Sequence, residues 1–177
     1  MRPKEELEIR QEMVSMHDEY LTRLNSAMQA EMYVEAAWLC YSIFEQRITR
    51  LIEKHISYCP RQKKTKGKPA AISTRIACVQ HLITAQYGGY KSFNSQLLED
   101  ILNWCDRRND LVHGLITLDH YKKYDVEFKQ LALDGEPLVQ KLYREVSKFR
   151  KWYYKEKSFD KFPEFFCCCR KQKCIYN

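Results

Sequence analysis

Residues 94–115 read NSQLLEDILNWCDRRNDLVHGL, and this stretch predicts an amphipathic α-helix. Its apolar positions recur mostly at helical spacing, and they are Leu97, Ile101, Cys105, Leu111, Val112 and Leu115. Ser92 or Asn94 is a suitable N-terminal cap, and Gly114 stands where helices commonly end. The chain is therefore expected to build its core from helices.

The same periodicity extends over most of the chain and predicts further helices. The expected segments are residues 4–28, 31–56, 72–87, 120–133 and 136–157. Asn25 and Ser26 lie near the first junction and could cap or bend it, unless one long helix runs through, and Gly88-Gly89 mark another junction. Asp134-Gly135 is expected to separate the last two helices, with Pro137 in the first turn of the second. These signals predict a single all-α bundle of four or five principal helices.

Length and composition support one domain with a tail. The chain has 177 residues, 45% of them hydrophobic, and only five glycines and five prolines. So few turn residues disfavour a β-sandwich or barrel, and no apolar run is long enough for a membrane span. We expect residues 1–157 to form the bundle and residues 158–177 to form a basic, cysteine-rich tail. The charged N-terminus does not resemble a signal peptide, which predicts a cytoplasmic protein.

The eight cysteines are expected to be reduced thiols in that compartment. Cys40, Cys78 and Cys105 lie in apolar helical patterns and are interpreted as small core residues. The tail holds four more, Cys167, Cys168, Cys169 and Cys174. Adjacent cysteines do not easily share one tetrahedral zinc ion, and no histidine lies near them. We therefore predict no metal and no cofactor.

One segment, residues 106–115 (DRRNDLVHGL), could carry chemistry. An arginine followed a few residues later by a histidine occurs elsewhere by chance, as in Arg50–His55 and Arg75–His81. Those pairs lie inside continuous helical patterns, where such side chains are usually solvated at a helix edge. Only Arg108 is followed directly by asparagine, with His113 next to a helix-ending glycine. Glu45 is likewise expected at a helix edge, with only a weak indication of a role at the site.

The geometry of a helix sets a condition on this pair. Arg108 and His113 point about 140° apart on an ideal helix, so they converge only if the helix ends or bends near His113. Gly114 permits such an end. The alternative interpretation is that Arg108 pairs with Asp106 or Asp110 and that His113 caps the helix C-terminus.

Residues 108–113 (RNDLVH) resemble the signature of HEPN domains (higher eukaryotes and prokaryotes nucleotide-binding), which is arginine, a polar residue and then histidine. HEPN domains are small α-helical bundles, and the order of helices over residues 5–157 is similar to theirs. The resemblance implies a metal-independent endoribonuclease whose site is composed across a homodimer. It also implies a toxin or defence effector, with a cognate antitoxin or regulatory protein as a possible partner.

The resemblance assigns a role to each residue of the motif. His113 would act as general base or acid, and Arg108 would stabilise the phosphate oxygens. Asn109 would hold the other two in place by hydrogen bonding, and Arg107 is the competing phosphate clamp. HEPN toxins that are modified by partner nucleotidyltransferases carry a tyrosine two residues after the histidine. Leu115 occupies that position here, so the same modification is not expected.

The net charge of +7 favours an anionic partner, and RNA is the expected one. The loop over residues 60–70 carries four lysines that could contact phosphates, Lys63, Lys64, Lys66 and Lys68. Trp152, Tyr153 and Tyr154 could add base stacking, although burial on the last helix is the simpler interpretation. The alternative function is a non-catalytic HEPN-like module that binds RNA, a nucleotide or a protein.

Overall fold

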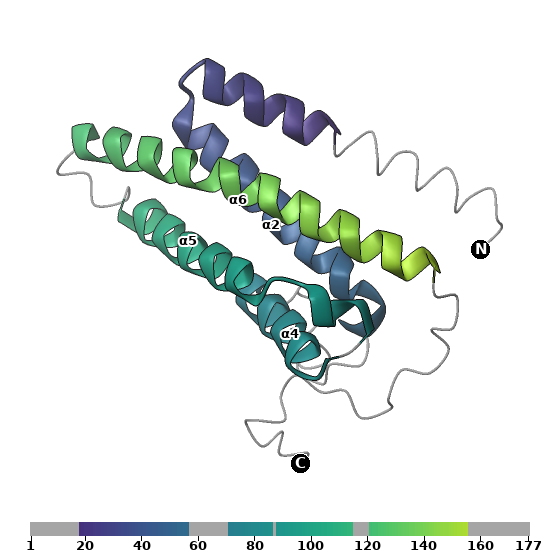
Figure 1. Ribbon diagram of the computed structural model, residues 1–177. Coiled ribbons are helices and arrows are strands. Elements are labelled where there is room, and N and C mark those ends of the chain that lie inside the picture. Colours follow the sequence, from purple (N-terminus) through teal and green to yellow (C-terminus); the bar gives the residue numbers. More distant parts are fainter. Residues whose placement is uncertain (1–17, 57–70, 87, 115–120, 156–177) are drawn as a thin grey trace, which may run out of the picture. The chain divides into compact units, whose positions relative to one another are not determined.

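The computed structural model describes residues 18–56, 71–86, 88–114 and 121–155 of the chain (Figure 1). This part is 92% helical, with five helices and no strands, which confirms the predicted all-α bundle. Among the same residues, none of the helices combines the length and the apolar character needed to cross a membrane. The predicted C-terminal tail, residues 158–177, lies outside this description.

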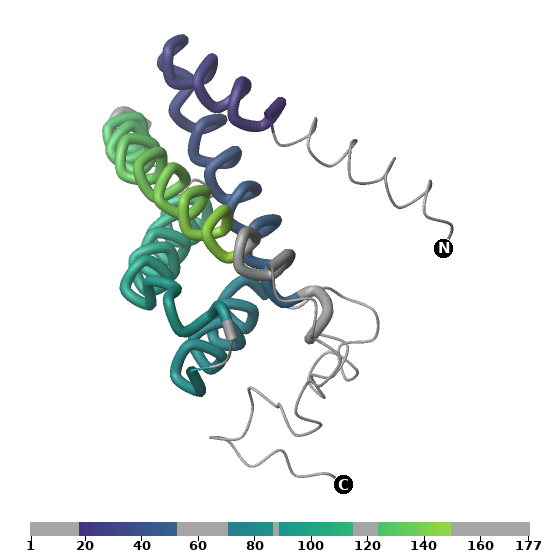
Figure 2. Tube along the Cα trace, turned by 45° about the vertical axis from the view of Figure 1, so that its right-hand side comes forward, coloured from purple at the N-terminus to yellow at the C-terminus, as the bar shows by residue number. Residues whose placement is uncertain are grey.

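The first helix covers residues 18–29. The other elements are α2 (Tyr33–Ile56), α4 (Ile72–Thr84), the short 3₁₀ helix η1 (Gly88–Ser92), α5 (Ser95–Gly114) and α6 (Tyr121–Lys155). Figure 2 shows η1 between the end of α4 and the start of α5. The predicted start of α5 is confirmed, because the backbone N–H of Leu97 donates to Asn94 Oδ1 over 3.3 Å. The described part of α5 reaches Gly114, and residues 115–120 lie outside the described residues.

The first junction lies where the predicted segments 4–28 and 31–56 meet. Asn25 and Ser26 are inside the helix of residues 18–29, and the chain turns at Glu31, which has a positive φ of 56°. The N–H of Glu31 donates to the Met28 carbonyl (3.2 Å), and the N–H of Met32 donates to the Ala27 carbonyl (2.8 Å). This pair of hydrogen bonds is the Schellman termination of a helix, which usually has glycine at the left-handed position. Because glutamate occupies it here, the turn lacks the usual glycine signal, and only the helical periodicity indicated the break.

The predicted separation of α6 into two helices is wrong, because α6 runs without interruption through Asp134, Gly135 and Pro137. Gly135 is required for packing: a Cβ atom there would lie 2.9–3.0 Å from three atoms of the Trp104 indole. Trp104 Nε1 donates to the Leu131 carbonyl over 2.8 Å, which holds the indole against this stretch of α6. Pro137 is exposed on the same helix.

The chain divides into two compact units, each drawn from several helices. Unit 1 comprises Met1–Ile43 and Trp104–Pro137, and unit 2 comprises Phe44–Asn103 and Leu138–Asn177. In unit 1 the first helix contributes Leu24 and Ala27 to the core, and Trp104 and Phe128 are the largest buried side chains. Burial of each such large apolar side chain stabilises a fold by roughly 1.5–3 kcal/mol.

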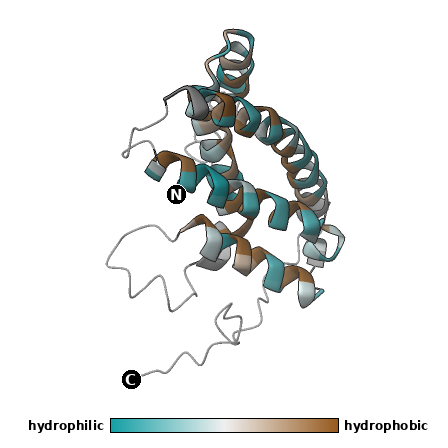
Figure 3. Cartoon of the chain, turned by 90° about the vertical axis from the view of Figure 1, so that its left-hand side faces the viewer, coloured by the Kyte–Doolittle hydropathy of each residue, from teal (hydrophilic) through white to brown (hydrophobic). Residues whose placement is uncertain are grey.

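Unit 2 is organised around Tyr90 of η1. Its hydroxyl donates to the Leu51 carbonyl, and its ring centroid lies 4.6 Å from that of Phe149. The core of unit 2 also contains Phe44 and Phe93, together with the aliphatic side chains Ile48, Ile52, Ile76, Leu82, Leu98 and Ile101. Figure 3 shows the corresponding pattern along the helices, with hydrophobic residues on one side and hydrophilic residues on the other.

Candidate functional site

Three arginines are buried among the described residues, and they differ in how their charge is compensated. Arg47, Arg75 and Arg108 have 5%, 6% and 7% of their surface exposed. In unit 2, Arg75 Nη1 lies 3.2 Å from Glu45 Oε1 and also donates to the Thr49 hydroxyl. The expectation that Arg75 is solvated at a helix edge is therefore wrong, because its carboxylate partner lies 30 positions away in the sequence. Arg75 is a structural residue.

Arg108 in unit 1 is enclosed by aromatic rings. Its guanidinium carbon lies 3.8 Å from the ring centroid of Trp38 and 4.7 Å from that of Tyr41. Trp38 and Tyr41 are three residues apart on α2, so one face of that helix presents both rings to α5. The contacts are cation–π interactions, in which the negative face of a ring attracts the guanidinium.

The hydrogen bonds of Arg108 are incomplete. Nη1 donates to Asn109 Oδ1 over 3.1 Å, so one of the two hydrogen bonds expected of Asn109 is present, while among the described residues none joins Asn109 to His113. Nε and Nη2 are buried and have no hydrogen-bond partner among the described residues. Arg108 also forms no ion pair with Asp106, Asp110 or any other described carboxylate, so the interpretation as a solvated charge pair is wrong.

Burial lowers the pKa of Arg108, and the nearby Tyr41 and Cys105 act in the opposite direction. An arginine remains protonated at neutral pH even after a substantial decrease, so the site holds a positive charge. A buried charge without a carboxylate partner is costly to folding. Such groups are candidates for function, because a ligand can supply the missing partner.

His113 is exposed in the last turn of α5. The helix continues to Gly114, so neither an end nor a break separates Arg108 from His113. The two side chains therefore keep the separation of about 140° that a regular helix imposes. Within the described part of α5, no bend brings the two side chains together.

Gly114 makes a close contact with Tyr124 of α6. Tyr124 Oη donates to the Gly114 carbonyl over 2.8 Å, and a Cβ atom at position 114 would lie 2.8 Å from the same oxygen. Glycine is therefore required for the close approach of Tyr124. This contact joins the end of α5 to the start of α6 within unit 1.

Arg107, the competing clamp, has a different environment. It is exposed, and its Nη1 lies 2.8 Å from Asp134 Oδ2 on α6. Asp134 is fixed in turn by Gln130, whose Nε2 donates to Oδ1 over 2.8 Å. The charge of Arg107 is thus already compensated, which leaves Arg108 as the stronger candidate.

The remaining predicted site residues, Lys63, Lys64, Lys66 and Lys68, lie outside the described residues, as do the cysteines of the tail. Of the three predicted core cysteines, Cys40 and Cys105 are buried and Cys78 is half-buried. Within the described ranges, no group of three His, Cys, Asp or Glu side chains is placed to hold a metal ion.

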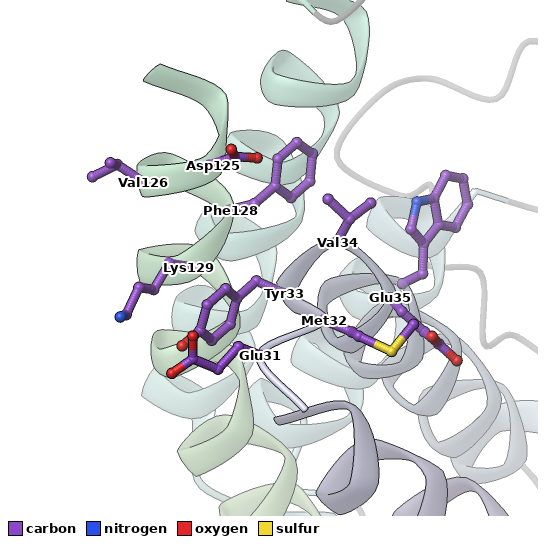
Figure 4. Close-up of a pocket in the computed structure, with 10 residues that line it drawn as sticks. Glu31, Met32, Tyr33, Val34, Glu35, Asp125, Val126, Phe128 and Lys129 are labelled. Carbon is purple, nitrogen blue, oxygen red and sulfur yellow. The ribbon is translucent and has the colours of Figure 1, made fainter. Parts of the chain in front are cut away.

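A pocket of about 850 Å³ lies beside Trp38 in unit 1. Its lining comes from residues 31–38, around the start of α2, and from residues 125–129 of α6 (Figure 4). Trp38 therefore has two environments, the guanidinium of Arg108 and the pocket. Sequence reasoning missed both Trp38 and Tyr41, because their spacing shows only that they share a helix face and gives no sign of an arginine some 70 positions away.

No protein-family model matches the chain, and no curated protein or solved structure does so either. The chemistry of the site itself is thus the basis for inferring function.

Proposed function

We propose that the protein is a cytoplasmic, metal-independent endoribonuclease of the HEPN type, with a site composed across a homodimer. The observation that supports this most is the state of Arg108. Its charge has no described carboxylate partner, two of its nitrogens lack hydrogen-bond partners, and Asn109 holds its remaining terminal nitrogen. A phosphate group would supply both the missing charge and the missing acceptors.

The reaction would proceed by attack of the ribose 2′-oxygen on the adjacent phosphorus. One His113 removes the proton of the 2′-hydroxyl, and a second His113 donates a proton to the departing 5′-oxygen. The P–O5′ bond breaks, which leaves a 2′,3′-cyclic phosphate and a 5′-hydroxyl. Arg108 stabilises the additional negative charge on the non-bridging oxygens.

A homodimer is favoured by the placement of these side chains. One chain supplies a single His113, which points away from Arg108 on α5, whereas the reaction needs a base, an acid and a cation at one phosphate. A twofold axis would bring Arg108 of one protomer near His113 of the partner subunit. Because Trp38 covers Arg108, the indole would have to move aside when phosphate binds.

The biological class follows from the family resemblance. Endoribonucleases of this type act as toxins or defence effectors, and a cognate antitoxin or regulatory protein would hold the enzyme inactive. The four lysines of the predicted basic loop would contribute affinity for RNA by neutralising phosphates.

A second function is favoured by one specific observation. The guanidinium of Arg108 is enclosed by Trp38 and Tyr41, an arrangement that can also be purely structural. The corresponding function is a non-catalytic HEPN-like module that binds RNA, a nucleotide or a protein partner.

The two functions are separated by incubating the purified protein with total RNA in the presence of EDTA. The wild type should cleave and leave cyclic-phosphate ends. His113→Ala and Arg108→Ala should each reduce the rate about 100-fold or more, which is typical for loss of an acid–base group or of a charge-stabilising group. Arg23→Ala is the matched control, because Arg23 is exposed and, within the described part of the chain, forms an ion pair with Glu19 alone.

Circular dichroism and thermal unfolding should accompany the cleavage assay, because Arg108 is buried. Arg108→Lys retains the charge and loses the planar fork, so it distinguishes loss of folding from loss of the clamp. Cleavage by His113→Ala at the wild-type rate would contradict the nuclease proposal. So would activity that EDTA abolishes and a divalent ion restores. RNA binding without cleavage by the wild type would favour the second function.

A further inference from the structure

The pocket beside Trp38 gathers most of the exposed apolar surface in the described part of the chain. Four large apolar side chains that line it are strongly exposed: Met32 (51%), Val34 (42%), Trp38 (48%) and Val126 (68%). Only one other large apolar residue among the described residues is comparably exposed, Leu133 at 44%. Exposed apolar groups that cluster in this way typically mark an interaction surface.

The pocket is also acidic, on a protein whose net charge is +7. Glu31, Glu35 and Asp125 line it, against one cation, Lys129. Lys129 Nζ lies 5.2 Å from the ring centroid of Tyr33. Figure 4 shows these side chains around the depression between the start of α2 and α6. We call this surface, defined by Met32, Val34, Trp38, Val126 and the three carboxylates, the acidic groove.

The backbone fixes the position of one wall of the acidic groove. Glu31 has a positive φ, which costs about 1 kcal/mol for a residue with a side chain, and two hydrogen bonds of the helix termination hold it there. Strained backbone of this kind clusters at binding sites. The wall is therefore formed before any ligand binds.

Charge decides between the possible occupants. Nucleic acid is disfavoured, because its phosphates would face three carboxylates and one ammonium. A second copy of the same surface is also disfavoured, since a twofold contact would place the carboxylates of one groove against those of the other. A protein segment with apolar anchors and basic flanks matches both the apolar lining and the charge.

We propose that the acidic groove binds an amphipathic helix of a partner protein, which places apolar side chains against Val34, Trp38 and Val126. Lysine or arginine residues beside that apolar face pair with Glu31, Glu35 and Asp125. A helix that lies in an apolar groove is a common mode of recognition, with anchors spaced three or four residues apart. This docking does not depend on RNA cleavage.

Binding of a partner helix would also affect Arg108, because of the position of Trp38. This part of the inference rests on the proposed function. The indole lines the acidic groove and also covers the guanidinium of Arg108. A bound helix would hold Trp38 in place and so keep phosphate away from Arg108.

Selection from a display library of random 16-residue peptides on the immobilised full-length chain tests the proposal. Selected peptides should combine a net positive charge with apolar residues spaced by three or four. Synthetic copies should bind in calorimetric titrations. Val126→Asn and the double variant Glu35→Gln/Asp125→Asn should each weaken binding at least ten-fold. All three positions are exposed, so the fold should be retained.

Two matched controls should bind as the wild type does. Leu133→Asn changes an exposed apolar residue of α6 that does not line the acidic groove, and Glu99→Gln removes an exposed carboxylate of α5. Selection of acidic peptides, or failure to select any, would overturn the proposal. Peptide binding that is equally strong in the groove variants and the control variants would also overturn it. So would a homodimer of the wild type that dissociates only in the groove variants, because the groove would then bind a second copy of the chain. RNA cleavage is measured in a separate assay. If the protein does not cleave RNA, binding of the helix to the acidic groove still stands, and only the proposal that the bound helix keeps phosphate away from Arg108 is refuted.

Discussion

Arg75 and Arg108 show how the partner of a buried cation distinguishes structure from function. Arg75 meets a carboxylate and a hydroxyl, and its charge is compensated within unit 2. Arg108 meets two aromatic rings and an amide oxygen, which attract a cation but do not neutralise it. The burial of the two residues is nearly equal, so exposure alone would not separate them.

The contact between Trp38 and Arg108 should be measurable as a coupling free energy. In a double-mutant cycle with Trp38→Ala and Arg108→Met, we expect a coupling of about 0.5–2 kcal/mol in urea unfolding, the range of partly buried cation–π pairs. Trp38→Phe should retain much of it, because a ring remains. Strictly additive effects of the two substitutions would show that the stacking contributes nothing to stability.

Cys40 provides a prediction about alkaline pH. Burial, followed by the nearby Glu136, raises the pKa of its thiol from 9.0 to about 12. In the unfolded chain this thiol loses its proton near pH 9, whereas in the folded protein it keeps it. The stabilisation is thus complete below pH 9 and is lost as the pH rises towards 12.

The stability advantage of the wild type over Cys40→Ala should therefore shrink with pH. Between pH 8 and pH 10.5 we expect a decrease of about 2 kcal/mol in that difference, at about 1.4 kcal/mol per pKa unit. Urea unfolding of both proteins at the two pH values provides the measurement. A difference that does not change with pH would show that the thiol titrates normally in the folded state.

The sequence predicted only part of the candidate site. Arg108, Asn109 and His113 lie within six residues in a recognisable pattern, and the structure shows a hydrogen bond between the first two. The rings that enclose Arg108, and the carboxylate that neutralises Arg75, come from α2, which lies far from both arginines in the sequence. Local periodicity reports which face of a helix is apolar, but it does not report which distant side chain will occupy that face.

Within the helices, glycine can either mark a turn or allow close packing, and α6 shows the second case. Asp134-Gly135 and Pro137 predicted the end of one helix and the start of the next, yet α6 continues through them. The close approach of the Trp104 indole selects glycine at position 135. Gly114, which was predicted as a helix end, makes a close contact with the ring of Tyr124. Both glycines therefore lie against an aromatic ring, which the local sequence pattern does not show.

Gly135→Ala should therefore destabilise the protein. In an ordinary helix interior this change stabilises by about 1 kcal/mol. Here the new methyl group would meet the buried Trp104 indole at 2.9–3.0 Å, so we expect a net loss of roughly 1–3 kcal/mol. Pro137→Ala is the control on the same helix: Pro137 is exposed, and the substitution should raise stability by about 1–3 kcal/mol. Increased stability of Gly135→Ala in urea unfolding would contradict the packing explanation.

For the whole molecule, composition and periodicity were sufficient to predict an all-α bundle. Few glycines and prolines, together with apolar residues at helical spacing, leave little alternative. The assignment of residues to two compact units was not predictable in the same way, because α2, α5 and α6 each contribute to both. Helical spacing does not reveal where along a helix its packing partners change.

Net charge leads to a prediction about RNA affinity. Replacement of Lys63, Lys64, Lys66 and Lys68 with alanine should weaken RNA binding for all sequences, because lysines that neutralise phosphates read no sequence information. The slope of log K against log salt should decrease by about 0.7 for each phosphate of single-stranded RNA that is no longer neutralised. Cleavage at saturating RNA should persist, since the chemistry is assigned to Arg108 and His113. Lys141→Ala, which removes an exposed lysine of α6, serves as the control, and an unchanged slope in the quadruple variant would exclude the four lysines from binding.

Pro137 has a consequence for the opening of α6 that amide hydrogen exchange can detect. Proline has no N–H to donate to the Leu133 carbonyl, so α6 lacks one backbone hydrogen bond at Pro137, the last residue of unit 1. Cooperative opening tends to stop where a ladder is interrupted. Amides of residues 124–133 should therefore exchange with deuterium as one set and those of residues 139–149 as another. One continuous helix would then report two separate opening free energies.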